Sequence, residues 1–366
     1  MTDADLLYGD VEEELRASVR RLLAQRVSPA VLAAAYDEPA GLSALWRGLA
    51  RDLGVAALLI PEELGGVGAT AREAAVVAEE IGRAVAPVPF LTSSVIATVA
   101  LLEAGDHETL AVLAAGEATA ALALGFGAAA PPVAATVKAT PAGLSGHVAT
   151  VADAGTATVL VVPAEGADGL ELHTVTAPGP GTTVTPVPSL DMTRPVADVA
   201  FDGAPSRRID RGDARGAVAE ALRAGAVLLA SEQIGVASRC FEMTLDYVRQ
   251  RYQFGRSIGS FQAVKHRLAD LWVEVGQAGA AARYAADTHA RRDPDVAVAA
   301  AVAQSYCGTV AVHAAEECVQ LHGGIGMTWE HPAHLYLKRA KADQLALGTP
   351  YEARSALAAL VGLPRA

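Results

Sequence analysis

Apolar residues recur at helical spacing through the first third of the chain. Asp10 can cap the segment VEEELRASVRRLLAQ, and the large apolar residues of that segment share one face: Val11, Leu15, Val19, Leu22 and Leu23. A glycine-rich loop, LGGVGAT, leads into a second helical pattern of small residues, AREAAVVAEEIGRAV. These patterns predict an N-terminal helical domain over residues 1–118.

The pattern changes over residues 119–210. Helical periodicity fades, and short runs rich in β-branched residues, such as ATVLVVPA and LELHTVTA, stand between glycines and prolines. Runs of this kind, broken by turn residues every few positions, are typical of strands joined by turns. We therefore predict a small antiparallel β-domain in the middle of the chain.

Helical periodicity returns over the remainder of the chain, residues 211–366. Helices of the predicted length can pair as an antiparallel bundle. Four such segments are predicted, at residues 216–249, 260–290, 294–322 and 333–346. The predicted fold class is α+β and mainly α, with an N-terminal helical domain, a small antiparallel β-domain and a C-terminal four-helix bundle.

Composition narrows the possible functions. Hydrophobic residues make up 52% of the 366 positions and aromatic residues only 5%, which favours closely packed helices. The formal net charge of −12, without a basic stripe, argues against nucleic acid as a partner. Apolar runs are too short to span a bilayer, and the N-terminal segment lacks the apolar core of a signal peptide. We expect a cytoplasmic protein that binds neither nucleic acid nor membrane.

The cysteines and histidines do not suggest a metal site. Three cysteines stand in helical sequence without paired spacing, and we interpret them as reduced, buried side chains: Cys240, Cys307 and Cys318. His322, His331 and His334 lie close in sequence, but carboxylate or thiolate partners at ligand spacing are missing. We therefore predict no metal, and we interpret these histidines as surface or packing residues.

The first candidate binding motif is RYQFGRSIGSFQAVKHRL. Arg251 falls at the end of one predicted helix, and Gln262 falls near the start of the next. An arginine and a glutamine beside a helix N-terminus can grip a pyrophosphate through charge-assisted bonds and free backbone N–H groups. The alternative is a structural helix–helix turn with a solvated arginine.

The second candidate motif is QLHGGIGMTWEHP. Gly323 and Gly324 would let a ligand approach the backbone closely, because no Cβ intervenes. Gln320 lies one helical turn earlier and offers both a donor and an acceptor. The alternative is a plain helix C-cap.

Together these segments resemble the acyl-CoA dehydrogenase family over nearly the whole chain. LGVAALLIPEELGGVG is similar to an N-terminal segment of that family, and the two motifs above are similar to its most specific C-terminal ones. The resemblance implies FAD bound at a subunit interface, where the neighbouring subunit contacts the adenosine and pyrophosphate. The residues that match this neighbour-supplied set are Arg251, Phe254, Gln262, Gln320, Gly323 and Gly324.

The chain departs from the family pattern where the flavin ring and the catalytic base would lie. The family's TEP..GSD segment is missing, and the place of its flavin-packing tryptophan falls near Thr150. The base is usually the Glu of an EGT segment, which here reads LGT with Leu347 in the Glu position. In a minority of members the base lies where this chain has Gly225. By this resemblance the chain has no catalytic residue, and Glu232 and Glu352 are interpreted as surface or capping residues.

Three hypotheses follow from the retained and missing residues. The first is a subunit of a heteromeric (α2β2) acyl-CoA dehydrogenase that lacks the base and completes the FAD site of a homologous partner, as in some actinobacterial members acting on steroid or other bulky acyl-CoAs. The second is a self-sufficient homo-oligomer with a non-standard base. The third is a non-catalytic scaffold protein of the same fold. The resemblance also implies an acyl-CoA substrate and an electron-transfer flavoprotein as acceptor.

Overall fold

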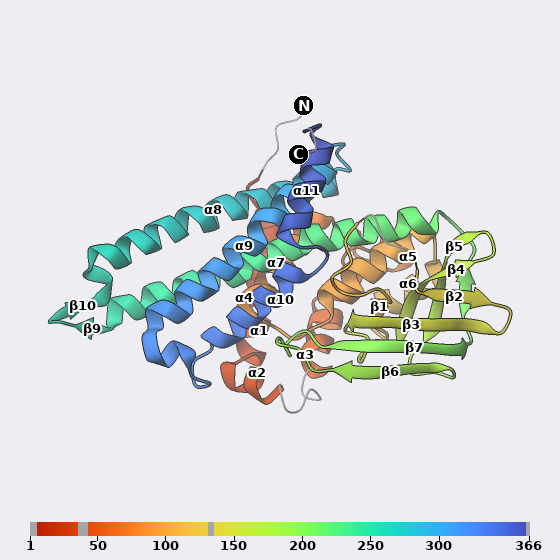
Figure 1. The fold of residues 1–366 in the computed structure, drawn as a ribbon, viewed down its shortest axis with the longest axis horizontal. Helices are drawn as coiled ribbons and strands as arrows, with labels where there is room; N and C mark the ends of the chain where they lie inside the picture. The colour runs from red at the N-terminus through yellow and green to blue at the C-terminus, as the bar shows by residue number, and fades with distance from the viewer. Residues whose placement is uncertain (1–5, 36–42, 131–134, 364–366) are drawn as a thin grey trace.

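The computed structural model describes residues 6–35, 43–130 and 135–363. A sheet occupies one end of the molecule, long helices extend to the other end, and the N-terminal helices pack between them (Figure 1). The N-terminal helices are α1 (Asp10–Arg26), α2 (Pro29–Ala35), α3 (Ser43–Arg47), α4 (Ala71–Ala84), α5 (Thr98–Ala104) and α6 (His107–Ala114). Shorter helical segments join them: η2 (Gly48–Asp52), η3 (Val55–Ala57), η4 (Glu62–Leu64) and η5 (Phe90–Ala97).

Helix α1 begins at Asp10 itself, so the prediction that this residue caps the helix is wrong. Gly9 takes the N-cap position, and its backbone N–H donates to Glu12 Oε2 at 2.9 Å. Of the five residues predicted to form the apolar face of this helix, Val11 is 68% exposed. The buried or half-buried members are Leu15, Val19, Leu22 and Leu23.

The middle part of the chain forms an eight-stranded sheet in the order β6-β7-β3-β2-β4-β5-β8, with β1 beside β4. The strands β1 and β2 run parallel to β4, so the sheet is mixed and not wholly antiparallel as predicted. Neither parallel pair is joined by a tight turn, and strands joined by longer connections can pair in either direction. The strands are β1 (Ala120–Leu122), β2 (Val137–Thr140), β3 (Gly143–Ala152), β4 (Val159–Gly166), β5 (Gly169–Thr176), β6 (Thr182–Val187), β7 (Val196–Ala204) and β8 (Arg207–Ile209).

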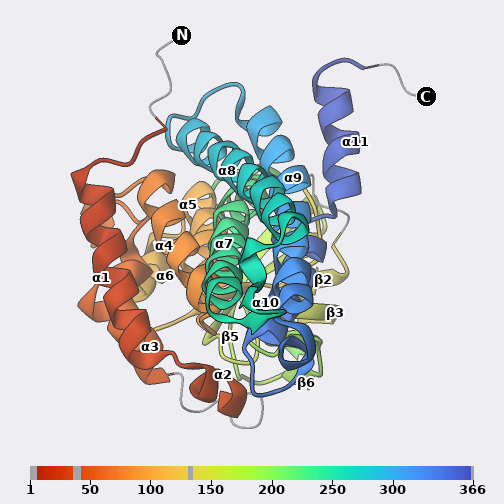
Figure 2. The same cartoon turned by 90° about the vertical axis from the view of Figure 1, so that its left-hand side faces the viewer.

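The C-terminal part contains the four predicted helices, whose ends differ from the prediction by at most two residues. They are α7 (Ala214–Gln250), α8 (Gln262–Ala290), α9 (Val296–His322) and α10 (Ala333–Leu345). A small hairpin of β9 (Tyr252–Gln253) and β10 (Arg256–Ser257) and the turn η6 (Ile258–Ser260) join α7 to α8, and the turn η7 (Gly323–Met327) follows α9. A further helix, α11 (Pro350–Leu360), was not predicted and stands at the side of the bundle (Figure 2).

One large core joins the N-terminal helices to the bundle, and a second lies within the sheet. Helices α4 and α7 pack closely through two glycines. A Cβ on Gly82 would lie 2.0 Å from the Glu232 carbonyl oxygen, and one on Gly235 would lie 1.9 Å from the Glu79 carbonyl oxygen. Any larger residue at either position would push the two helices apart.

Helix α9 with η7 is long and apolar enough to cross a membrane by length and composition alone. Half of its most apolar window is buried inside the protein, and α9 contacts α7, α8, α10 and α11. These contacts place α9 within the bundle, where the buried half of that window packs on other helices.

Candidate functional site

Leu347 lies in the short connection between α10 and α11. It is 3% exposed, and its φ of 54° is uncommon for a residue with a branched side chain. Two contacts hold the backbone in this conformation. The Leu347 N–H donates to the Phe126 carbonyl oxygen at 2.8 Å, and the Gln304 side-chain amide donates to the carbonyl oxygens of Leu347 and Gly348.

The structure brings Leu347 and Gly225 together, although they lie more than a hundred residues apart in sequence. A Cβ on Gly225 would lie 2.9 Å from Leu347 Cδ1 and 2.8 Å from Ile96 Cγ1. The two positions at which the family resemblance places a base therefore face the same spot. Here that spot is filled by the side chains of a leucine and an isoleucine.

Only a small cavity remains beside Leu347. Its volume is about 20 Å³, enough for little more than one water molecule. The segment after β1 forms one of its walls, because Phe126 lines the cavity and its carbonyl oxygen accepts the Leu347 hydrogen bond. The remaining lining residues are Thr92, Ile96, Leu122, Leu124, Gly125, Ala152 and Leu222.

A buried carboxyl that was not predicted, Asp153, lies behind this cavity. It is 6% exposed and accepts a hydrogen bond from Thr92 Oγ1 at 2.7 Å. Burial raises the pKa of Asp153 above its usual value. Thr92 therefore stands between this carboxyl and the cavity. The sequence pattern gave no signal for it, since Asp153 follows a strand and reads as a turn residue.

Glu232 is not the surface or capping residue that we predicted. It is 1% exposed, and its Oε1 lies 2.6 Å from Arg194 and 2.7 Å from Arg339. Burial alone would raise the pKa of Glu232, but the two guanidinium groups outweigh burial and hold the pKa below its usual value. The prediction failed because both arginines come from distant segments, the β6–β7 loop and α10.

Asp343 completes this buried charge cluster from α10. Burial, followed by the charge of Glu232, raises the pKa of Asp343 to about 8. Its carboxyl oxygens have no hydrogen-bond partner among the described residues, and Arg194 Nε lies 3.6 Å away. Arg339 Nε lies 3.5 Å from the other carboxyl oxygen, and the cluster joins the β6–β7 loop, α7 and α10.

Glu352 has the capping role that we predicted. It is exposed at the start of α11, where Thr349 is the N-cap. The Thr349 N–H donates to Glu352 Oε2 at 2.7 Å, and the Glu352 N–H donates to Thr349 Oγ1 at 3.2 Å. The two bonds together form a capping box, so the Glu352 carboxylate is hydrogen-bonded to the first turn of α11.

The candidate cofactor-binding residues all lie at the far end of the bundle. Arg251 is the C-cap of α7, and Gln262 is the first residue of α8. The two motifs meet there, because the Tyr247 and His322 rings lie 4.4 Å apart and His322 directly precedes η7. The exposed members of the predicted set are Arg251, Phe254, Gln262, Gln320, Gly323 and Gly324.

The two glycines of this set differ in backbone conformation, and only one of them needs to be glycine for that reason. Gly323 has a φ of 63°, which favours glycine, whereas Gly324 does not have a positive φ. A Cβ at either position would meet no described atom within 4 Å. Within this chain, therefore, packing does not explain a glycine at position 324.

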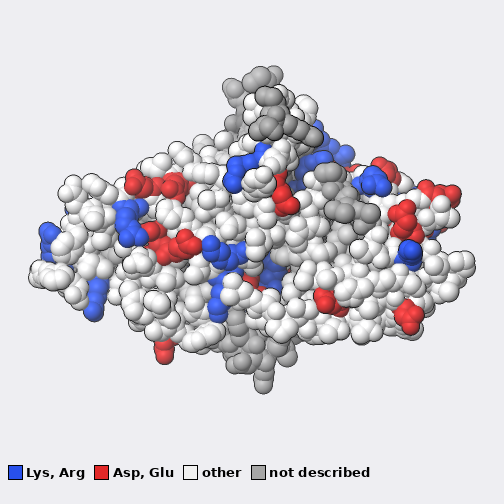
Figure 3. Space-filling view, in the orientation of Figure 1, with Lys and Arg blue, Asp and Glu red and all other residues white. Residues whose placement is uncertain are grey.

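The same end of the molecule exposes basic and apolar side chains. Separate Lys and Arg side chains lie near this end (Figure 3), and Arg251, Arg256 and Lys265 are exposed between the end of α7 and the first turns of α8. Large apolar side chains around the two motifs are also exposed: Tyr252, Phe254, Ile325, Met327 and Trp329. A concentration of exposed large apolar side chains in two neighbouring segments is typical of a protein interface. A group of His, Cys, Asp and Glu able to hold a metal ion is not found in the part of the chain that the structure describes.

The chain is similar to known proteins over almost its whole length. A family model for the acyl-CoA dehydrogenase N-terminal domain matches residues 9–117, and one for the C-terminal domain matches residues 215–359. The acyl-CoA dehydrogenase IpdE2 of Mycolicibacterium smegmatis is 37% identical over 345 residues, which cover 94% of this chain and 96% of that protein.

Solved structures show the same fold. A variant of the Tcur3481-Tcur3483 steroid ACAD is 30% identical with a TM-score of 0.85, covering 98% of this chain and 99% of that one. A chain of the ChsE4-ChsE5 complex from Mycobacterium tuberculosis is 26% identical with a TM-score of 0.85, covering 99% of this chain and 100% of that one. Butyryl-CoA dehydrogenase from Megasphaera elsdenii, at 21% identity and a TM-score of 0.87, shares the fold over 98% of this chain and 100% of its own.

Proposed function

Because the chain belongs to the acyl-CoA dehydrogenase family, whose members are FAD-dependent flavoproteins, we propose that it is the non-catalytic subunit of a heteromeric enzyme. In this role it completes the FAD site of a homologous, cytoplasmic partner that carries the base. The observation that carries the proposal is the contrast between its two candidate sites. The position of the base is closed by apolar side chains, while the residues matching the cofactor grip are exposed.

The closed site lacks a group that could take the α-proton of a thioester. A general base must come within about 2.6–3.2 Å of that proton's carbon or reach it through one water. Leu347 and Gly225 offer no acid or base, and the nearby carboxyl of Asp153 stands behind Thr92. Glu232 is held by two arginines. Desaturation therefore requires a base from another chain.

The same site does not fit a flavin. A cavity of about 20 Å³ with an apolar lining has neither the volume nor the hydrogen-bonding groups for an isoalloxazine ring. The loop that contains Phe126 is hydrogen-bonded to Leu347, so the closure is part of the packed structure.

The exposed end of the bundle fits the other half of FAD. Arg251 can pair with a phosphate, and the N-terminal N–H groups of α8 lie beside Gln262. Gly323 and Gly324 present open backbone. The apolar side chains around them, from Tyr252 to Trp329 in the two motifs, would be buried by the partner.

The proposed reaction is α,β-desaturation of an acyl-CoA, with electrons passing to an electron-transfer flavoprotein. FAD, when bound, supplies the hydride acceptor. The chain's own residues would position the adenosine and pyrophosphate and exclude water from the interface. Two similar structures carry paired names, Tcur3481-Tcur3483 and ChsE4-ChsE5, and the first is a steroid ACAD. These names support a heteromer (α2β2) and a bulky acyl group such as a steroid side chain.

The test is to purify the chain together with its homologous partner and to substitute one of the exposed residues proposed to bind FAD. Arg251→Gln should lower FAD retention and turnover of the complex at least tenfold, because a charge-assisted phosphate contact is lost. The matched control, Arg215→Gln, removes an exposed arginine at the opposite end of the same helix and should leave both unchanged. Equal FAD retention in the two variants would contradict the proposed role.

Two alternatives give different outcomes. A self-sufficient homo-oligomer would desaturate acyl-CoAs without a partner, and substitution of Glu232 or Glu352 would abolish that turnover. A scaffold protein would form no FAD-containing complex at all. The small apolar cavity beside Leu347 favours the heteromer over the first alternative, and the retention of both cofactor-binding motifs favours it over the second.

A further inference from the structure

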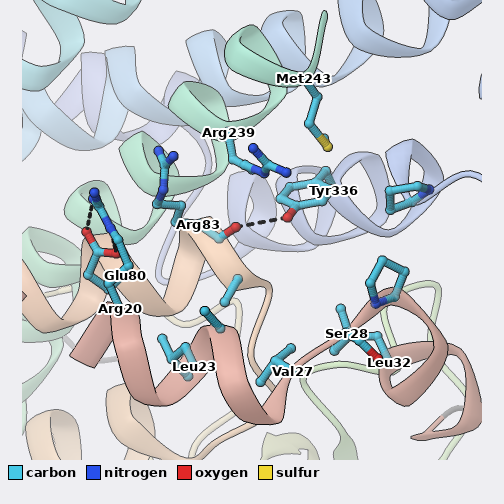
Figure 4. Close-up of a pocket in the computed structure, with 14 residues that line it drawn as sticks. Arg20, Leu23, Val27, Ser28, Leu32, Glu80, Arg83, Arg239, Met243 and Tyr336 are labelled. Carbon is cyan, nitrogen blue, oxygen red and sulfur yellow. Dashed lines mark hydrogen bonds and ion pairs between the residues drawn. The ribbon is translucent and has the colours of Figure 1, made fainter. Parts of the chain in front are cut away.

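A pocket lined by none of the candidate cofactor-binding residues and by neither base position lies between the N-terminal helices and the bundle. It has a volume of about 250 Å³ and is lined from α1, α2, α4, α7 and α10 (Figure 4). Leu23 and Leu32, from α1 and α2, line one side, and Met243 lies on the opposite side with Arg239, both from α7 (Figure 4). Two further arginines line the pocket, Arg20 from α1 and Arg83 from α4.

Two of these arginines are neutralised by close carboxylates. Arg20 makes a two-bond contact with Glu80, with Nε at 2.8 Å and Nη2 at 2.6 Å. Arg83 makes a similar two-bond contact with Glu242. Each of these two guanidinium groups is paired with a carboxylate of the protein, so neither adds net charge to the pocket.

Arg239 is different. Its Nη1 makes only a longer ion pair with Glu242 Oε2, at 3.7 Å, because that carboxylate is already hydrogen-bonded to Arg83. Its other neighbour is the Tyr336 hydroxyl, which donates to the Arg83 carbonyl oxygen at 2.9 Å. Burial raises the pKa of Tyr336 to about 12, so the hydroxyl stays neutral at physiological pH. Arg83 and Arg239 thus share the one carboxylate of Glu242, and Arg239 is the guanidinium that it does not hydrogen-bond.

We propose that this pocket binds a small amphipathic monocarboxylate, with the carboxylate on Arg239 and the hydrocarbon against Leu23, Leu32 and Met243. A guanidinium presents paired N–H donors that match a carboxylate. A single spare arginine suits one negative charge, whereas a phosphate dianion would need more. The apolar side chains on both sides of the pocket and its volume suit a hydrocarbon body of medium-chain size.

Such a ligand would bridge α1, α7 and α10. It would add contacts between the N-terminal helices and the bundle that the chain alone does not make, so it should raise the melting temperature of the protein. This effect does not depend on FAD or on a partner subunit, so failure of this proposal and failure of the proposed function are distinguishable.

The probe is octanoate, titrated calorimetrically into the full chain, with octan-1-ol as its neutral counterpart. We expect saturable binding of one octanoate per chain and at least tenfold weaker binding of octan-1-ol. Arg239→Gln should weaken octanoate binding at least tenfold, whereas Arg215→Gln, on the same helix outside the pocket, should bind like the wild type. Ala84→Leu, which places a larger side chain in the pocket lining without touching the guanidinium, should also weaken binding.

Several results would overturn the proposal. They are the absence of saturable octanoate binding, equal affinity for octan-1-ol, and an Arg239→Gln variant that binds octanoate like the wild type. Circular dichroism of each variant distinguishes loss of binding from loss of folding. If Arg239→Gln fails to fold, Ala84→Leu and the comparison with octan-1-ol still decide the question.

Discussion

Replacing Leu347 by glutamate tests directly whether this position can hold a base. The leucine is 3% exposed and packs against Ile96 and Gly225. Losing its burial costs about 2 kcal/mol, and burying a carboxyl without a hydrogen-bond partner costs about 1–3 kcal/mol more. We expect Leu347→Glu to lower the free energy of unfolding by about 3–5 kcal/mol, without turnover of acyl-CoA by the lone chain.

The pH dependence of this loss identifies its cause. Burial should raise the pKa of the new carboxyl above its unfolded value of about 4.3. Between the unfolded and folded pKa values the folded variant binds one more proton than the unfolded chain, so its stability falls as pH rises. The deficit relative to the wild type should therefore be larger at pH 8 than at pH 5.

The assay is urea denaturation followed by circular dichroism at both pH values. Leu347→Gln is the matched control, because it loses the same apolar packing but has no ionisable group. Its deficit should be the same at pH 5 and pH 8. A glutamate variant as stable as the wild type, or one that desaturates an acyl-CoA on its own, would refute the reasoning.

The remaining predictions concern the same packing, the buried charges and the exposed turn. Gly225→Ala should destabilise the fold by about 1–3 kcal/mol through overpacking, and Leu347→Ala in the same chain should recover part of the loss; denaturation midpoints decide. Glu232→Gln should lower the free energy of unfolding by about 3–5 kcal/mol, because it breaks a buried ion pair; an unchanged urea midpoint would mean that the cluster contributes little. Asp343→Asn should gain stability relative to the wild type as pH rises from 5 to 8, since the raised pKa makes the wild type lose stability over that range; parallel pH profiles would contradict this. Gly324→Ala should leave the thermal midpoint of the lone chain unchanged but lower FAD retention in the complex, and equal retention would exclude close approach of a ligand there.

The helices of the bundle could be predicted from sequence because their periodicity is local. Each long helix repeats its apolar positions over many turns, so its ends were predicted within two residues. The parallel pairing of β1 and β2 with β4 depends on how separated strands return to the sheet. Periodicity within one strand contains no information on that return.

Part of the candidate site could also be predicted from sequence, and part could not. The motif around Arg251 and the motif around Gly323 are each one continuous stretch of sequence. The structure places these two stretches side by side at one end of the bundle. The burial of Glu232 could not be predicted, because Arg194 and Arg339 reach it from a loop and a helix far along the chain. The closure over Leu347 was also missed, since Phe126 lies in a stretch of glycine and alanine without a pattern of its own.

The most direct measurement is the flavin content of the purified protein, from its absorbance after denaturation. The chain alone should contain no stoichiometric FAD, and its complex with the homologous partner should contain two FAD for every four subunits. A lone chain that retains one FAD per subunit, or a complex that retains four per tetramer, would contradict the account.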